Sequence, residues 1–177
     1  MKEFDLNQLL QNTVLLSEKI QEFMAKKTLK KQNPDEEEIK GHIEKAEHNL
    51  RFIKDNLKMG YTDWCTTGCY YAAYHIVIAL IMTKGYASKN HLATLCTLIK
   101  EFYKKGIEKE DLEMINNLFI DYQDLIFYVE SKNKREDATY SSKKIYNTSS
   151  VEILRIKTAL FVDKVKEMIK AGTPYSK

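Results

Sequence analysis

The sequence contains few residues that break helices, with two prolines and six glycines among 177 residues. Proline removes a backbone hydrogen-bond donor and glycine loosens the chain, so their scarcity leaves room for long helices. No segment alternates apolar and polar residues over the length of a strand, and no internal repeat or low-complexity linker divides the chain. These absences favour a single helical domain over a β-sheet fold or a string of modules.

Cysteine is also scarce and odd in number, which argues against a disulfide framework. Cys65, Cys69 and Cys96 lie within apolar periodic segments, where reduced thiols are usually core residues. The chain begins without the basic and then apolar pattern of a signal peptide, and its longest apolar run, residues 76–82, is far shorter than a membrane span. We therefore expect a cytoplasmic protein with no membrane partner.

Most known catalytic signatures are missing as well. The sequence has no glycine-rich phosphate loop, no HExxH helix and no pair of CxxC knuckles. We therefore predict no metal and no cofactor. The net charge of +3 is too small to indicate nucleic-acid binding by itself, because a dedicated binder gathers its basic residues on one face.

Apolar residues recur at intervals of three and four along most of the chain, which is the period of an amphipathic helix. Helices are expected over residues 5–30, 35–60, 62–85, 88–106, 108–129 and from about 148 onward. The pattern predicts an all-α, up-and-down helical bundle of about five to six helices.

Cap residues mark the boundaries of these helices. Asp35 and Ser88 are suited to begin the second and fourth helices, and Gly85 and Gly106 to end the third and fourth. Residues 1–34 are expected to form an N-terminal helix that packs on or extends the bundle, and residues 35–177 to form the main domain.

A guanidinium and a phenol stand five residues apart, at Arg135 and Tyr140, just past the fifth expected helix. Arginine is a permanently charged planar fork suited to phosphate, and tyrosine adds a hydroxyl and a stacking ring. Nearby lysines are Lys132, Lys134, Lys143 and Lys144. This segment fits an edge that follows a phosphate backbone, and it equally fits a solvated connection whose lysines confer solubility.

Other basic and imidazole side chains have simpler interpretations. Positive charge near the end of the first helix complements the helix dipole, at Lys26, Lys27, Lys30 and Lys31. The histidines are scattered along the chain and suit structural roles individually, at His42, His48, His75 and His91.

The third expected helix carries the sequence Tyr70-Tyr71-Ala72-Ala73-Tyr74-His75, followed by Lys84-Gly85-Tyr86 and then His91. This arrangement resembles the YYAAxH segment, the helix-ending glycine and the downstream histidine of HEPN-domain proteins. Upstream, Ala46, Asn49, Leu50, Leu57 and Met59-Gly60 resemble the first core helix of that family, and Arg135-x-x-Ala138-x-Tyr140 resembles its R-x-x-A-D-Y ending. The order fits across residues 40–170 and is most similar to a prokaryotic HEPN branch often paired with minimal nucleotidyltransferases.

The resemblance implies a homodimer in which two copies of the arginine motif meet. Nuclease members of the HEPN family have histidine four to six residues after the arginine, and they cleave RNA without metal. This chain has Tyr140 at that position and Thr139 where the branch has aspartate. Tyrosine is a weak base because its pKa of about 10 leaves only about one molecule in a thousand ionised at pH 7.

Three hypotheses follow. The favoured one is a homodimeric module that binds RNA or nucleotide phosphate within a toxin–antitoxin or nucleotidyltransferase partnership. The second is a weak metal-independent ribonuclease, in which Arg135 stabilises developing charge and His75 or His91 replaces the missing histidine. The third is a protein-interaction partner with no nucleic-acid role, in which Tyr140 accepts a nucleotide from a partner enzyme. The candidate binding residues are Lys132, Lys134, Arg135, Tyr140, Lys143, Lys144 and His91, and the candidate catalytic residues are Arg135, Tyr140 and His75.

Overall fold

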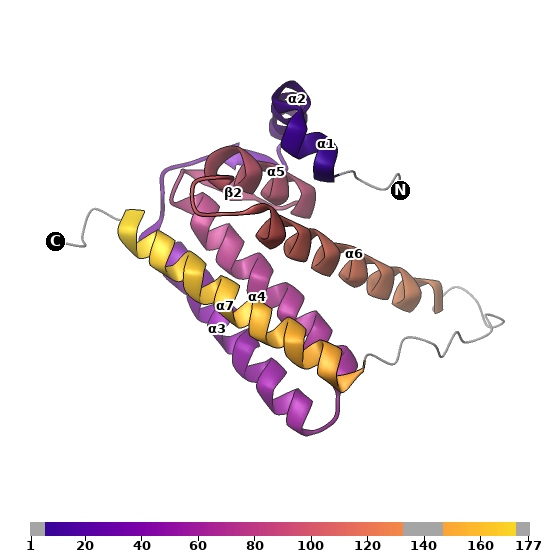
Figure 1. The fold of residues 1–177 in the computed structure, drawn as a ribbon. Helices are drawn as coiled ribbons and strands as arrows, with labels where there is room; N and C mark the ends of the chain where they lie inside the picture. The colour runs from indigo at the N-terminus through magenta and orange to yellow at the C-terminus, as the bar shows by residue number, and fades with distance from the viewer. Residues whose placement is uncertain (1–5, 133–146, 173–177) are drawn as a thin grey trace.

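The computed structural model describes residues 6–132 and 147–172, and their side chains except at 63 and 122–132. Within these ranges the protein is an all-α bundle with one small antiparallel sheet (Figure 1). The elements are α1 (Leu6–Gln11), α2 (Thr13–Ala25), β1 (Leu29–Lys31), α3 (Glu36–Lys58), α4 (Thr62–Met82), β2 (Tyr86–Ser88), α5 (His91–Phe102), α6 (Lys109–Lys132) and α7 (Thr148–Gly172). The predicted fold class is confirmed.

Helix α4 is the centre of the bundle and packs against α3, α5, α6 and α7. Small side chains along it, including Ala72 and Ala73, are completely or almost completely buried and let neighbouring helices approach closely. Its segment Trp64–Met82 is long and apolar enough to cross a membrane, but 78% of that window is buried inside the bundle. Burial among other helices thus accounts for its apolar character.

The N-terminal segment differs from the expected single helix over residues 5–30. Asn12 separates α1 from α2, because its side chain accepts a hydrogen bond from the Leu15 amide at 2.9 Å and caps the second helix. Lys27 then adopts a positive φ of 57°, and the chain leaves the helix as β1. Leu29 of this strand is buried and belongs to the same hydrophobic core as α4.

Strand β1 pairs with β2 in antiparallel register, with Leu29 opposite Ser88 and Lys31 opposite Tyr86. Ser88 was expected to cap the following helix, and this was wrong. Asn90 is the cap instead, because its side-chain oxygen accepts the Ala93 amide at 3.0 Å. Asp35 caps α3 as predicted, by accepting the Glu38 amide at 3.1 Å.

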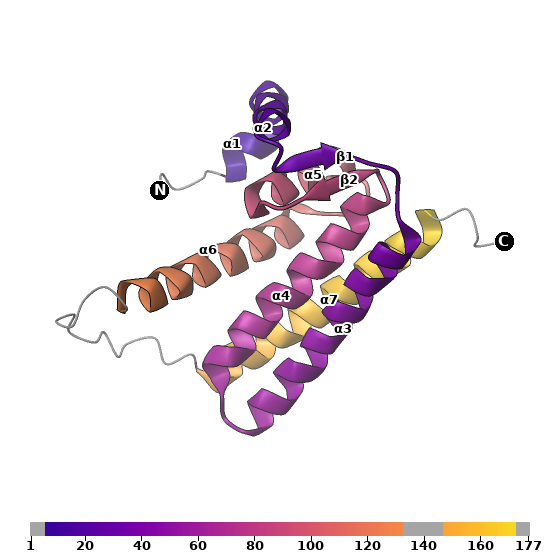
Figure 2. The same ribbon diagram turned by 180° about the vertical axis from the view of Figure 1, so that it is seen from behind.

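Helices α6 and α7 both pack on α4 but diverge from each other (Figure 2). An ion pair of 2.6 Å between Lys164 and Asp111 joins them, and another between Lys166 and Glu47 joins α7 to α3. The sheet lies where α4 ends, whereas the last residue of α6 and the first of α7 lie towards the other end of the molecule. The two ends of the molecule therefore carry different surfaces.

Candidate functional site

The arginine segment falls largely outside the residues that the structure describes. Arg135, Tyr140 and the lysines at 134, 143 and 144 belong to the chain between α6 and α7. Lys132 is the last residue of α6, and its side chain is likewise outside the described set. These assignments stay predictions, whereas His75 and His91 lie within the described residues.

The motif Tyr70–His75 divides its side chains between two faces of α4. Tyr71 and His75 are one helical turn apart, with ring centroids 6.3 Å apart, and His75 contacts His42 of α3. Tyr70 and Tyr74 are also one turn apart, and both contact His91 at the start of α5. The motif therefore joins α4 to α3 on one side and to α5 on the other.

His42 and His75 form a pair across the interface of α3 and α4. Their Nδ1 atoms are 2.9 Å apart and their ring centroids 5.1 Å apart. Burial, the neighbouring His42 and the charge of Lys45 lower the pKa of His75 to about 4, and burial also lowers the pKa of His42. Both rings are therefore neutral at pH 7, with one Nδ1 donating its proton to the other.

His91 is half-buried among aromatic rings. The Tyr70 hydroxyl lies 2.5 Å from Nδ1 and 2.8 Å from Nε2 of His91, and the centroid of its ring lies 4.5 Å from that of Tyr74 and 4.9 Å from that of Phe119. Burial lowers the pKa of His91 as well. The adjoining apolar cavity between α4, α5 and α6 holds about 20 Å³, which is room for about one water molecule and no larger ligand.

Tyr74 connects the two histidines. Its ring centroid lies 5.8 Å from that of His75 and 4.5 Å from that of His91. We refer to His42, Tyr70, Tyr71, Tyr74, His75, His91 and Phe119 as the aromatic cluster. Its neutral imidazoles can hold or accept a proton, but at pH 7 they supply no positive charge for a phosphate.

The contribution of His42 to this cluster was not predicted from the sequence. The spacing of residues in the sequence does indicate this position, because His42 lies one helical turn from Ile39 and Ala46, which are both buried on the apolar face of α3. A histidine on that apolar face lies on the side of α3 that packs against α4.

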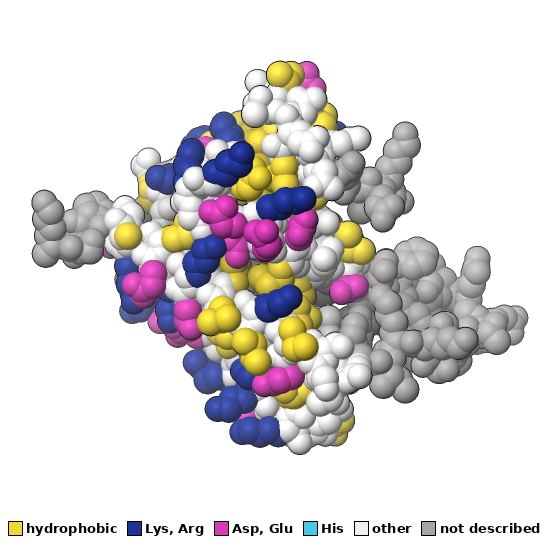
Figure 3. Space-filling view, in the orientation of Figure 1, with side chains coloured by type: hydrophobic (Ala, Val, Ile, Leu, Met, Phe, Trp, Pro, Cys, Tyr) yellow, Lys and Arg dark blue, Asp and Glu magenta, His cyan; other side chains and the backbone are white. Residues whose placement is uncertain are grey.

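A groove of about 550 Å³ runs between α6 and α7. Its walls include Asp111, Met114, Leu118 and Asp121 from α6, and Leu154, Lys157, Leu160, Phe161 and Lys164 from α7. Leu160 of this wall is 64% exposed, and Ile153 and Ile156, which precede it on α7, are 55% and 45% exposed. These three lie on one side of α7 and form what we call the α7 ridge, and Figure 3 shows apolar side chains gathered on this face.

The described residues contain no group of three or more histidine, cysteine, aspartate or glutamate side chains placed to hold a metal ion. Cys65, Cys69 and Cys96 are all free and buried, as expected for core thiols. Burial is the main reason that the pKa values of Cys69 and Cys96 rise to about 12, so neither thiol is a nucleophile near neutral pH.

Comparison with known proteins agrees with the resemblance seen in the sequence. The family model described as HEPN domain matches residues 39–154, from α3 into the start of α7. The chain is 28% identical over 133 residues to a Methanocaldococcus jannaschii protein named "Putative toxin", covering 75% of this chain and 82% of that protein. It is 25% identical over 134 residues to the "UPF0332 protein" of Archaeoglobus fulgidus, covering 75% of this chain and 96% of that one. Because the model matches more than half of the 177 residues, the chain belongs to the HEPN domain family.

Proposed function

We propose that this HEPN protein is a homodimeric module that binds RNA or nucleotide phosphate through Arg135 and Tyr140. We further propose that it acts in a toxin–antitoxin or nucleotidyltransferase-associated system. Family membership and the similarity to a protein named as a toxin support this assignment. The cationic fork of arginine and the ring of tyrosine supply the phosphate contact and the stacking surface that such a ligand needs.

The observation that carries the proposal is the α7 ridge beside the α6–α7 groove. Exposed aliphatic side chains in one row are unfavourable in water, by roughly 25 cal/mol per Å² of apolar surface, and such rows commonly mark interfaces. The ridge begins at Ile153, five residues after the start of α7, and α6 ends at Lys132. The chain that carries Arg135 therefore joins the two helices that border the groove.

A second copy of the chain is the natural occupant of this face. In a two-fold dimer the same surface is used twice, so in the proposed dimer the ridge of one copy packs on the ridge of the other. The groove is also lined by the carboxylate of Glu110 on α6 and the ammonium of Lys157 on α7. Opposite charges on its two walls allow reciprocal ion pairs between copies.

Binding is favoured over cleavage by the state of the described histidines. His75 and His91 are half-buried within the aromatic cluster, and their ring nitrogens lie within hydrogen-bonding distance of His42 and Tyr70. A ribonuclease needs a base that reaches the ribose 2′-hydroxyl, and Tyr140 is a weak one. The proposed module therefore retains RNA without turning it over.

The test is incubation of the purified protein with labelled RNA in EDTA, scored for both retention on a native gel and cleavage. Arg135→Ala should weaken retention, while Tyr140→Phe, which keeps the ring, should weaken it less. Arg51→Ala is the matched control, because Arg51 is exposed on α3. EDTA-resistant cleavage that requires Arg135 would instead establish the ribonuclease, and neither retention nor cleavage would point to a protein partner.

A further inference from the structure

Lysines gather at the end of the molecule that carries the sheet. Residues 26–31 and 84–105 contain nine lysines and a single acidic residue, Glu101, although the whole chain has a net charge of only +3. Pairing of β1 with β2 and packing of α5 against α2 and β2 bring these two segments together. Figure 3 shows lysine and arginine side chains over this end of the molecule. We call eight of them the lysine surface: Lys27, Lys30, Lys31, Lys84, Lys89, Lys100, Lys104 and Lys105.

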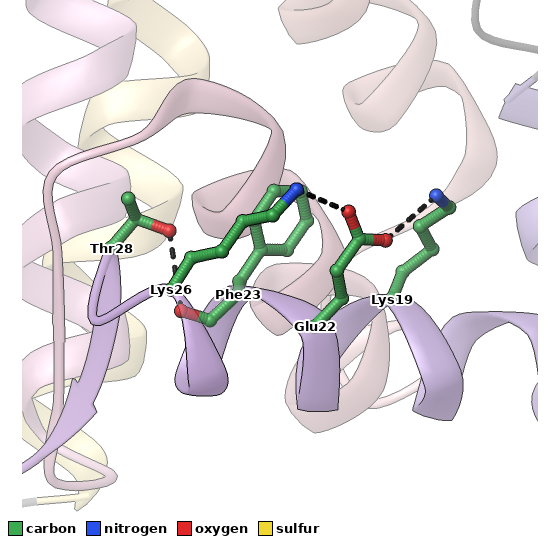
Figure 4. A network of polar contacts seen from close by, with 5 residues as sticks. All are labelled: Lys19, Glu22, Phe23, Lys26 and Thr28. Atoms are coloured by element: carbon green, nitrogen blue, oxygen red, sulfur yellow. Dashed lines mark hydrogen bonds and ion pairs between the residues drawn. The ribbon is translucent and has the colours of Figure 1, made fainter.

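The charges of the lysine surface are not neutralised by described carboxylates. The ninth lysine, Lys26, differs because Glu22 accepts hydrogen bonds from it at 2.6 Å and from Lys19 at 3.0 Å (Figure 4). Among the described residues no carboxylate forms an ion pair with any of the eight. The local carboxylate of Glu101 accepts the Tyr86 hydroxyl at 2.9 Å.

Helix dipoles account for only part of this accumulation. Helices α2, α4 and α5 end here, and each C-terminus carries roughly half a negative charge. Three helix ends therefore balance roughly one or two lysines. Most of the positive charge is left to face the solvent.

Several of the ammonium groups are held in place by the fold. The Lys31 ammonium lies 3.3 Å from the centroid of the Tyr86 ring and donates to the Lys84 carbonyl at 3.1 Å. The Lys84 ammonium lies 5.9 Å from the Phe102 centroid, and that of Lys104 lies 5.4 Å from the Tyr103 centroid. Cations held over rings lose less conformational freedom when they meet an anion.

We propose that the lysine surface binds the phosphate backbone of single-stranded RNA through residues other than those of the Arg135 segment. None of the large apolar side chains that are strongly exposed in the described chain belongs to residues 26–31 or 84–105. A membrane-binding surface or a stable protein interface would need such side chains at its centre. A flexible polyanion needs only spaced cations, and it would be bound with little preference for sequence.

The test measures binding of fluorescent oligouridine to the full chain in EDTA, over about 50 to 200 mM KCl. A combined variant removes four positive charges from the lysine surface by the substitutions Lys31→Gln, Lys84→Gln, Lys100→Gln and Lys104→Gln. Each lost phosphate contact should reduce the slope of log affinity against log salt by about 0.7, so the slope should fall by up to about 3. Affinity at the lowest salt should fall at least about tenfold.

Two further variants distinguish the effect of where the lysines lie from the effect of the total charge of the protein. The control variant removes four exposed lysines from α3 and α6 by the substitutions Lys40→Gln, Lys54→Gln, Lys58→Gln and Lys109→Gln. It should keep most of the affinity for oligouridine. Arginine at the four surface positions should restore binding. An unchanged slope in the first variant, or an equal loss in the control, would overturn the proposal.

The oligouridine experiment tests the lysine surface independently of the role proposed for Arg135. If Arg135→Ala binds oligouridine as the parent does while the four-glutamine surface variant does not, the Arg135 function fails and the lysine surface stands. The reverse pattern would remove the lysine surface and leave the Arg135 function in place. Circular dichroism of each variant confirms that the helical content is unchanged.

Discussion

The Nδ1 atoms of His42 and His75 face each other at 2.9 Å across the contact between α3 and α4. Only one of the two nitrogens can carry the proton of that hydrogen bond, so the pair is satisfied when both rings are neutral. Protonation of both rings would set two Nδ1–H donors and two positive charges against each other in a half-buried site, with Lys45 nearby. The most extensive contact between two helices in the described part of the chain thus contains a pair of side chains whose protonation in acid is unfavourable.

We predict that acid destabilises the protein through this pair. The pKa of His75 is about 4 in the folded chain against an ordinary 6.5, so between these pH values the unfolded chain binds more protons than the folded chain. The free energy of unfolding should therefore be insensitive to this group above about pH 6.5, and should fall as the pH drops towards 4. Urea unfolding at a series of pH values measures the effect.

The variant His75→Asn provides the comparison. Asparagine keeps a hydrogen-bonding atom near the position of Nδ1 but cannot take up a proton. The variant should lose less stability than the parent between pH 7 and pH 5. Equal losses in the two proteins would show that the histidine pair does not govern the acid response.

A second prediction concerns the close approach of α3 and α4. A Cβ atom added at Gly68 would stand 2.6 Å from Cγ1 of Ile53 and 3.2 Å from Cδ1 of Phe52. Gly68→Ala should destabilise the protein by about 1 to 3 kcal/mol, as overpacking does, despite the better helix propensity of alanine.

Gly41 provides the matched control, since it lies within α3 and a Cβ there would meet no atom within 4 Å. Gly41→Ala should stabilise the protein by up to about 1 kcal/mol, because alanine gains helix propensity without a clash. Thermal or urea unfolding of the two variants compares them directly. A stabilised Gly68→Ala protein would mean that α3 and α4 can separate at little cost.

The sequence predicted the long helices well because each is encoded locally. Apolar residues at intervals of three and four, the Asp35 cap and the glycine after α4 all act within a few residues of the boundary that they set. The apolar composition of α4 also explains its central position, because a helix that is apolar on all sides has to be covered on all sides.

The small sheet could not be predicted in the same way. β1 and β2 are three residues each, and they pair residues more than fifty positions apart, as Lys31 does with Tyr86. No local pattern records such a pairing, and the lysines of residues 26–31 were therefore interpreted as belonging to one helix end. The lysine surface exists only because the sheet brings the two segments together.

The histidine pair likewise could not be predicted from local sequence. His75 was identified from the motif that contains it, but its partner His42 lies 33 positions away in the chain. Neither residue suggests the other without knowledge of how α3 and α4 align. The Arg135 and Tyr140 assignments rest on sequence and resemblance, so the RNA experiment with Arg135→Ala is their direct test.

The last prediction concerns the α7 ridge and the proposed homodimer. Ile156 and Leu160 are 45% and 64% exposed, and in the proposed dimer they pack against the same side chains of a second copy. The double variant Ile156→Asp, Leu160→Asp would place four carboxylates at such an interface, where burying unpaired charge costs several kcal/mol. We expect the parent to be a dimer at micromolar concentration by light scattering, and the variant to be a monomer with unchanged helical content. Val14→Asp is the control, since Val14 is 66% exposed on α2, away from the ridge, and this variant should remain dimeric. A monomeric parent, or a double variant that still dimerises, would show that this face does not join two copies.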